Sequence, residues 1–97
     1  MRVIARRTLR EFWVVHPSAE QPLKAWFSEA TAGSWDSPQS IKDRYRHASF
    51  VGDNRVVFNI GGNKFRLITH VNYEFGIVYI KYVGTHADYN RVNPETV

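Results

Sequence analysis

The chain has 97 residues, of which 43% are hydrophobic, so it is long enough for one small core and too apolar to be disordered. Its charge of +4 suggests an anionic partner, nucleic acid first. It contains no cysteine, which excludes disulfides, thiol catalysis and cysteine-ligated zinc. No apolar run approaches the roughly 18–20 residues that span a bilayer, and no secretory signal is visible. We expect a single domain over residues 1–97, cytoplasmic and without membrane contact.

The basic residues are clustered, and this favours a polyanionic partner over a merely soluble basic protein. Charge alone leaves these two alternatives about equal. Residues 42–66 contain six basic residues and only two acidic ones, Asp43 and Asp53. The basic residues are Lys42, Arg44, Arg46, Arg55, Lys64 and Arg66. A second basic group is opposed only by Glu11: Arg2, Arg6, Arg7 and Arg10.

The N-terminal part predicts a short strand and two helices. Residues 2–5 read as a strand, and Thr8 with Glu11 fits a capping box that would start the first helix. Pro17 should end that helix. The second helix should begin between residues 18 and 23 and stop at Gly33. Their predicted core residues are Leu9, Phe12, Trp13, Leu23, Trp26, Phe27 and Ala30.

A third helix is predicted from Ser37, a good N-cap residue, with Pro38 at the first helical position, to about residue 44 or 45. Residues 46–54 read as a loop, with Phe50 or Val51 pinned to the core.

Residues 55–84 predict an antiparallel meander of three strands. A two-residue turn at Gly61-Gly62 would pair Phe58 with Phe65. One face is then largely apolar, with Val56, Phe58, Ile60, Phe65, Leu67, Thr69 and Val71. The other face is largely polar, with Arg55, Asn59, Lys64, Arg66, His70 and Asn72. This alternation predicts an α+β domain with helices on one side of the sheet and water or a ligand on the other.

The turn at Glu74-Phe75 sets the register of the last strand. It should oppose residue 72 to residue 77 and residue 66 to residue 83. Tyr79 and Lys81 would then join the polar face, with Tyr82 in the core, and a slip of one residue would reverse this. Thr85 should cap one helical turn that ends at Tyr89, and residues beyond about 93 should fray.

The polar face suits RNA binding, and a catalytic interpretation is also open. Cations there would attract phosphates, while Tyr79, Tyr89 and His70 could stack on unpaired bases. Cleavage of RNA without a metal requires activation of a 2′-OH, stabilisation of the phosphorane and protonation of the leaving 5′-oxygen. Arginine suits the second task, and histidine, tyrosine or lysine suits the others. The four histidines are too widely spread for a zinc motif.

Two segments, RVVFNIGGNKFRLI at 55–68 and YIKYVGTHADYNR at 79–91, resemble the HigB-type toxins of type II toxin–antitoxin modules. These toxins belong to the RelE-like superfamily of small RNA endonucleases. The likeness covers about residues 55–90, whereas the first fifty residues match only in pattern. It implies an N-terminal strand and two to three helices packed on one face of an antiparallel meander.

The resemblance implies a toxin that cleaves mRNA without a metal or cofactor, often on the translating ribosome, and a HigA-like helix-turn-helix antitoxin as its partner. The matched family positions are Asn63, Lys64, Arg66, His86 and Tyr89. We assign Arg66 to the scissile phosphate, His86 or Lys64 to proton transfer, and Tyr89 to positioning or stacking a base. The expected RNA-binding residues are Arg55, Asn63, Lys81, Tyr79, His70 and Arg46.

Two alternatives stay open. One is a non-catalytic basic module that binds RNA or the ribosome, which needs the same patch and no proton-transfer group. The other is a toxin-fold protein that acts on a protein target such as gyrase, because a fold alone does not establish an activity.

Overall fold

Five strands form one sheet in the order β1-β5-β4-β3-β2 in the computed structural model, which describes all residues 1–97. The edge strand β1 runs parallel to β5, and the other neighbours are antiparallel. The strands are β1 (Arg2–Ile4), β2 (Ser49–Val51), β3 (Arg55–Ile60), β4 (Phe65–Asn72) and β5 (Ile77–Thr85). The helices are α1 (Arg6–Val15), α2 (Glu20–Ala32), α3 (Pro38–Arg44) and α4 (His86–Tyr89).

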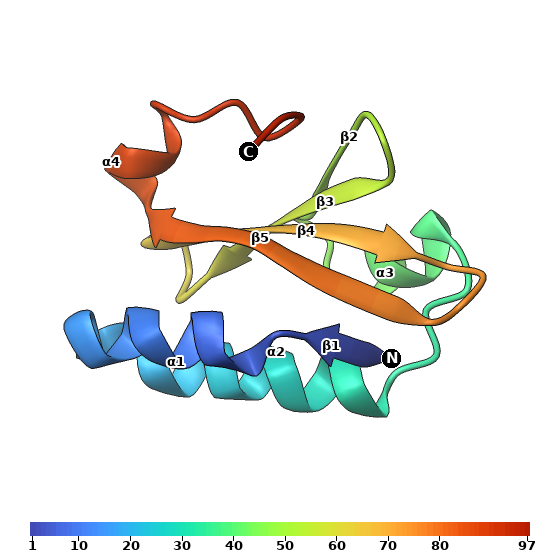
Figure 1. Cartoon of the computed structure of the whole chain (residues 1–97), viewed down its shortest axis with the longest axis horizontal. Helices are drawn as coiled ribbons and strands as arrows, with labels where there is room; N and C mark the ends of the chain where they lie inside the picture. Colours follow the sequence, from blue (N-terminus) through green and yellow to red (C-terminus); the bar gives the residue numbers. More distant parts are fainter.

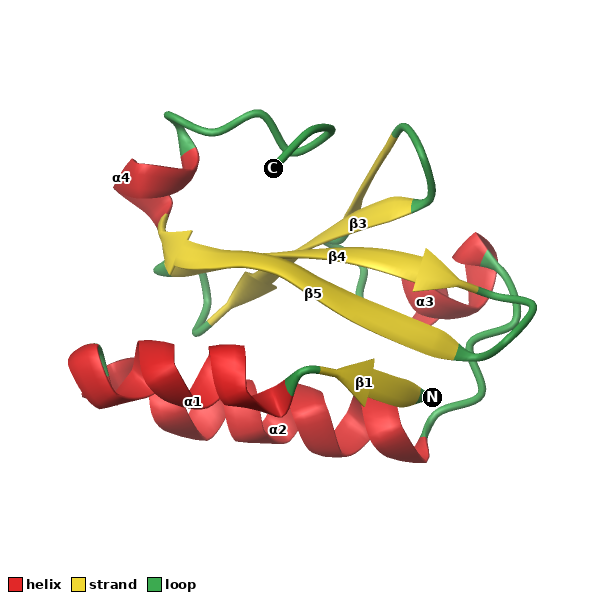
Figure 2. Cartoon of the chain, in the orientation of Figure 1, coloured by secondary structure: helices red, strands yellow, loops and turns green.

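The first two helices lie along one face of the sheet, and α4 lies on the opposite side, at the end of β5 (Figures 1 and 2). The expected α+β class is thereby confirmed. No helix in the structure is both long enough and apolar enough to cross a bilayer.

The first helix begins earlier than predicted. It starts at Arg6, with Ala5 as N-cap and no side-chain cap, so the predicted capping box at Thr8 is wrong. Glu11 instead forms an exposed ion pair with Arg7, with 3.2 Å between Oε2 and Nε. The physical reason is the direct passage from β1 into the helix, which leaves Thr8 inside the first turns. The predicted end before Pro17 is confirmed.

The second and third helices follow the sequence signals closely. A 3-10 turn at Pro17–Ala19 leads into α2, which begins within the predicted range and ends before Gly33. Pro22 lies in the first turn of α2, where a backbone N–H would have no intrahelical acceptor. Ser37 caps α3, since its side chain accepts a hydrogen bond from the Ser40 backbone N–H.

Residues 46–54 are not all loop as predicted, because β2 lies within them. Ser49 pairs with Val57, and Val51 pairs with Arg55. Phe50 is 39% exposed, and Ala48 is buried in its place. An edge strand can be held by backbone pairing alone. Its side chains therefore need not alternate between apolar and polar, the pattern from which strands are predicted.

Aromatic side chains from α2, from the connector before α3 and from the residue after α3 surround Phe58 in the core. Phe58 is 1% exposed, and the Trp26, Trp35 and Tyr45 rings lie 5.4, 5.9 and 5.0 Å from it between centroids. Two of these contacts are edge-to-face, the geometry that aromatic quadrupoles prefer. Phe58 of β3 is therefore one of the points at which the sheet packs on the helical side of the core.

The β3–β4 turn is longer than predicted, but the two faces of the hairpin are as predicted. Ile60 pairs with Phe65, so four residues form the turn, and Phe58 opposes Leu67. Gly61 and Gly62 have φ angles of 62° and 72°, a region that favours glycine. The shift equals two residues, and because side chains alternate with a period of two, every side chain keeps its face.

A bulge changes the predicted register of β5. Asn72 opposes Ile77 as predicted, but an irregularity between Ile68 and Thr69 places Arg66 opposite Gly84 instead of residue 83. The strand from residue 82 onward therefore presents the opposite set of side chains to each face. The prediction that Tyr82 faces the core is consequently wrong. Lys81 is the unpaired residue of the bulge and does not lie opposite a residue of β4.

The C-terminal segment folds back over the polar face of the sheet, on the side of α4 (Figure 1). The Arg55 Nη1 atom donates hydrogen bonds to the Pro94 and Val97 carbonyl oxygens, at 3.1 and 2.6 Å. Val57 and Ile68, which belong to this face by alternation, are buried. The residues that we expected to fray thus lie against the sheet.

We predict that Phe58→Ala lowers the free energy of unfolding by about 3–5 kcal/mol, because it leaves a cavity among three aromatic rings. Chemical denaturation would measure the change. Phe75→Ala is the matched control: this side chain is 72% exposed, and its loss should cost no more than about 0.5 kcal/mol. Equal effects of the two substitutions would contradict the described core.

Stability should fall at alkaline pH because of Tyr45. Burial raises the pKa of its phenol above the ordinary 10.0, and a hydrogen bond from the hydroxyl to the Glu29 carboxylate raises it further. The unfolded chain therefore loses this proton first, so the contribution is complete below about pH 10 and is lost as pH rises through the folded pKa. Denaturation measured from neutral pH to above pH 10 should show a smaller alkaline loss for Tyr45→Phe, and an equal loss would contradict the assignment.

Candidate functional site

The Arg66 guanidinium joins the β3–β4 turn to the start of α4. Its Nη1 atom donates to the main-chain oxygens of Asn63 and Phe65, at 3.2 and 3.1 Å. Its Nη2 atom lies 2.6 Å from the Asn63 side-chain oxygen and 2.7 Å from the His86 Nδ1 atom. Arg66 thereby brings together three predicted site residues: Asn63, Arg66 and His86. More than twenty positions of the sequence separate the first from the last.

This guanidinium is a buried cation without a counter-ion. Arg66 is 8% exposed, and all four of its partner atoms belong to neutral groups when His86 is neutral. No carboxylate forms an ion pair with it. Because a buried charge is costly unless it is compensated, the site has the electrostatic character that an anion would complement.

The contact with Arg66 sets the tautomer of His86. A guanidinium only donates, so the Nδ1 atom must accept and the imidazole proton lies on Nε2. The residue itself is exposed. In this arrangement His86 presents an N–H donor to the outside, while its basic lone pair is occupied by Arg66.

Tyr89 and Lys64 complete the predicted cluster. The Arg66 Cζ atom lies 5.8 Å from the centroid of the Tyr89 ring, a cation–π distance. Lys64 is exposed, and its side chain makes no hydrogen bond or ion pair. Its main-chain oxygen accepts from the His86 N–H at 2.9 Å. The short α4 is held in place by this bond and by the predicted Thr85 cap, whose hydroxyl oxygen accepts from the Asp88 N–H at 3.1 Å.

Tyr82 is a neighbour of this cluster that the sequence analysis placed in the core. A Cβ atom at Gly84 would lie only 2.2 Å from the Tyr82 hydroxyl oxygen, so the phenol lies over Gly84, directly across from Arg66. Burial raises the pKa of Tyr82, and the nearby Asp88 carboxylate raises it further. The phenol therefore keeps its proton at neutral pH and can donate a hydrogen bond. The bulge in β5 places Tyr82 here, and the sequence pattern alone gave no sign of that bulge.

The largest cleft in the structure, about 680 Å³, opens beside the cluster. Asn59, which opposes Arg66 across the hairpin, lines it together with Gly62. The segment after α3 forms its other wall, with Arg44, Tyr45, Arg46, His47 and Ala48. Arg46, predicted to bind RNA, thus lies in the cleft. His47 and Asn59 were missed as candidates, although the alternation of β3 already placed Asn59 on the polar face.

The remaining predicted residues lie away from the cluster. His70 and Tyr79 form a cross-strand pair on the polar face, with ring centroids 6.1 Å apart, and Arg55 opposes His70. His70 lies four positions after Arg66 in β4, roughly 13 Å away along the strand. Arg55 holds the C-terminal segment, and its Nε atom has no partner.

Lys81 is the unpaired residue of the β5 bulge and lines a groove beside α1. The four-cation face expected from the sequence is thus reduced to Arg66 and Lys64 at the cluster. No three His, Asp or Glu side chains lie close enough together to hold a metal ion.

Residues 19–92 match the family model of HigB toxins, described as the RelE-like toxic component of a toxin–antitoxin system. The chain is also 28% identical over 96 residues to the mRNA interferase toxin HigB of Escherichia coli K12, an alignment that covers 93% of this chain and 88% of that protein. The mRNA interferase HigB of Shigella flexneri matches with the same identity and coverage.

The hydrogen bond between Arg66 and His86 can be tested by ¹⁵N NMR of the imidazole rings. We expect a single neutral tautomer for His86, with the proton on Nε2. In Arg66→Ala the Nδ1 signal should move toward that of the exposed His47, which serves as an internal reference. Unchanged sheet amide signals would show that the variant is folded. A proton on Nδ1 in the unsubstituted protein would contradict the contact.

Proposed function

We propose that this chain, which belongs to the HigB family of RelE-like toxins of toxin–antitoxin systems, is an mRNA interferase. The relatives that it matches carry that name. We further propose that residues 1–97 act as a single domain and that cleavage requires no metal or cofactor.

The observation that carries this proposal is the buried Arg66 guanidinium without a carboxylate partner, in contact with an imidazole. A planar guanidinium can hold two phosphate oxygens and stabilise the negative phosphorane. The imidazole supplies a nitrogen that can accept a proton and later donate it. A merely RNA-binding surface needs neither the burial of the cation nor its bond to a histidine.

Substrate binding would expose the base. When the Arg66 Nη2 atom turns from His86 to a phosphate oxygen, the Nδ1 lone pair becomes free to take the proton of the 2′-OH. The 2′-oxygen then attacks the adjacent phosphorus and the bond to the 5′-oxygen breaks. The products are a 2′,3′-cyclic phosphate and a free 5′-OH, whose proton comes from Lys64 or from His86 once it is protonated.

The aromatic and basic groups around the cluster would hold the RNA. The Tyr89 ring lies at cation–π distance from Arg66, and a base stacked on that ring would place its phosphate nearby. Arg46 and His47 in the neighbouring cleft would contact phosphates of the flanking nucleotides. We also propose that the substrate is mRNA on the translating ribosome in the cytoplasm, and that a HigA-like helix-turn-helix antitoxin neutralises the toxin.

Primer extension on cellular mRNA after brief induction would test the proposal. The unsubstituted protein should produce discrete new 5′ ends within translated frames. Arg66→Ala should reduce them about 10²-fold or more, because it removes both the phosphate fork and the ligand of His86. The matched control is Arg2→Ala, which removes an exposed arginine from the far end of the sheet and should leave cleavage intact.

The other outcomes separate the alternatives. Intact mRNA together with arrested growth would overturn the ribonuclease and favour a protein target. Intact mRNA without any effect on growth would favour a binding module. Cleavage by a folded Arg66→Ala variant at the normal rate would overturn the role of this cluster.

A further inference from the structure

The cleft beside the candidate site has one wall that the rest of the chain holds in place. The Lys42 Nζ atom donates to the Ala48 main-chain oxygen at 2.9 Å, and the Ala48 N–H donates to the Tyr45 oxygen at 3.1 Å. The Tyr45 ring also packs edge-to-face on Phe58, with 5.0 Å between centroids. Residues 45–48 line the cleft of about 680 Å³. Because this wall is already ordered, a ligand that enters the cleft loses less free energy to ordering it.

Asn59 lies in the facing wall, and its side-chain amide is unpaired. The residue is exposed and lines the cleft. Its cross-strand neighbour, Arg66, directs its donors to Asn63, Phe65 and His86, and the Asn59 amide makes no hydrogen bond within the chain. A carboxamide presents an acceptor oxygen beside an N–H donor group. The cleft therefore contains a free donor–acceptor pair next to the guanidinium.

The main chain of Asn59 supplies a second free donor–acceptor pair. The Val71 N–H donates to the Asn54 oxygen at 2.9 Å, which makes these two residues a hydrogen-bonded pair of the β3–β4 ladder. Such pairs alternate with non-hydrogen-bonded ones, and the pair of Asn59 and Arg66 is of the second kind. The Asn59 N–H and C=O therefore point away from β4. On that side β2 reaches only to residue 57, and no main-chain hydrogen bond joins Asn59 to the turn before β2.

The lining of the cleft is basic and contains no carboxylate. Arg46 and His47 are exposed and form no ion pair. Arg44, the third basic lining residue, is paired with Glu29, which does not line the cleft. Cations beside free hydrogen-bonding groups suit a nucleotide, because its phosphate is anionic and its base carries donors and acceptors.

We propose that this cleft binds an unpaired purine base of the RNA next to the scissile phosphate, and that Asn59 recognises the edge of that base by hydrogen bonds. The proposal rests on the ribonuclease function proposed above and names a residue that sets its sequence preference. Asn59 lies directly opposite Arg66, and side chains at such positions have Cβ atoms roughly 5 Å apart. A base held by Asn59 is thus adjacent to a phosphate held by Arg66.

The two donor–acceptor pairs of Asn59 favour a purine over a pyrimidine. An asparagine amide forms a bidentate pair with N6 and N7 of adenine. A purine carries a further hydrogen-bonding edge on its six-membered ring, which the main-chain N–H and C=O can match. A pyrimidine has no counterpart of the N7 acceptor, so it can satisfy only one of the two pairs.

The first test measures RNA binding without cleavage, using hexamers of 2′-O-methyl RNA, which lack the attacking 2′-hydroxyl. The unsubstituted protein should bind a uridine hexamer with one central adenosine or guanosine about tenfold more tightly than the all-uridine hexamer. In Asn59→Ala this ratio should fall to about twofold or less, because the bidentate pair is lost. Asn59→Asp keeps the shape of the side chain and removes its N–H donors, so it should lose the preference too. Its added charge affects both hexamers and cancels in the ratio.

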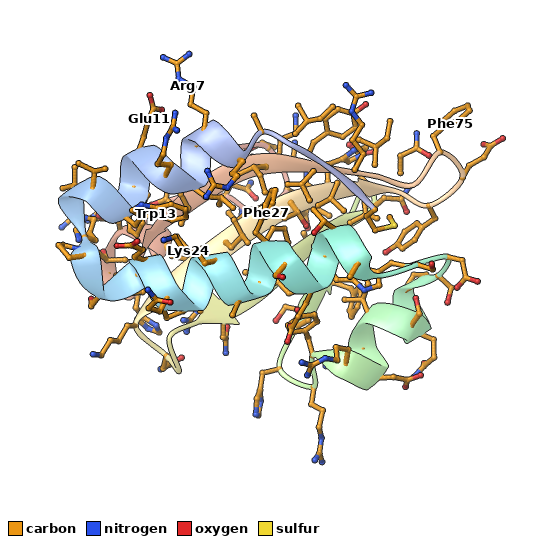
Figure 3. All side chains as sticks on the ribbon, turned by 90° about the horizontal axis from the view of Figure 1, so that it is seen from below. Arg7, Glu11, Trp13, Lys24, Phe27 and Phe75 are labelled. Atoms are coloured by element: carbon orange, nitrogen blue, oxygen red, sulfur yellow. The ribbon has the colours of Figure 1, made fainter.

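Two control variants lie on the helical side of the sheet. Gln21→Ala removes an exposed amide from α2, and Arg7→Ala removes an exposed arginine whose side chain projects outward from α1 (Figure 3). Both should keep the purine preference, and circular dichroism should show that all four variants are folded. In ¹⁵N NMR of the unsubstituted protein, the side-chain amide signals of Asn59 should shift when the adenosine hexamer is added, and those of Gln21 should not.

The second test maps the 5′ ends of cellular mRNA after brief induction. Cuts made by the unsubstituted protein should be enriched for a purine at one fixed position beside the cut. In Asn59→Ala this enrichment should fall to the background frequency of the base, with fewer cuts in total. Gln21→Ala should leave both the enrichment and the number of cuts unchanged.

The outcomes distinguish this proposal from the ribonuclease function on which it rests. If the unsubstituted protein makes no new 5′ ends, the ribonuclease is overturned, and the hexamer titration still decides whether Asn59 recognises a purine. A purine preference that persists in both Asn59→Ala and Asn59→Asp would overturn the proposal, as would its absence in the unsubstituted protein. A shift of the His70 ring signals in place of the Asn59 amide would put the base elsewhere on the polar face and would overturn it as well.

Discussion

The arrangement of the candidate site depends on the hydrogen bonds of one guanidinium. Arg66 connects the turn that carries Asn63 with α4, which carries His86 and Tyr89. Hydrogen bonds to a charged group typically contribute about 1.5–3 kcal/mol each, enough to hold a four-residue helix that buries no side chain of its own. All of the acceptors are neutral, so they satisfy the donors without cancelling the charge. One interaction thus both shapes the site and leaves it attractive to an anion.

The bulge in β5 decides which groups surround that guanidinium. One extra residue in the strand brings Gly84 opposite Arg66 and carries the Tyr82 phenol onto the same face. It also sends Lys81 to the groove beside α1. Bulges re-aim side chains in this way because the residues beyond them change face. Arg66 and Lys64 are consequently the cations at the cluster, and Lys81 is not opposite either of them.

The start of β4 connects the Arg66 cluster to α1. Phe65 packs edge-to-face on Phe12 of α1, with 5.5 Å between centroids, and the next residue is Arg66.

The sequence by itself determined the class of the fold, the faces of the β3–β4 hairpin and the group of residues 63, 64, 66, 86 and 89. These depend on local signals: alternation along strands, proline and glycine at helix ends, and a motif with specific spacing. Tertiary structure alone decided the edge strand β2, the bulge that moved Lys81 and Tyr82, and the tail on Arg55. Backbone pairing creates such features, and it depends on neighbouring strands that a local pattern does not contain.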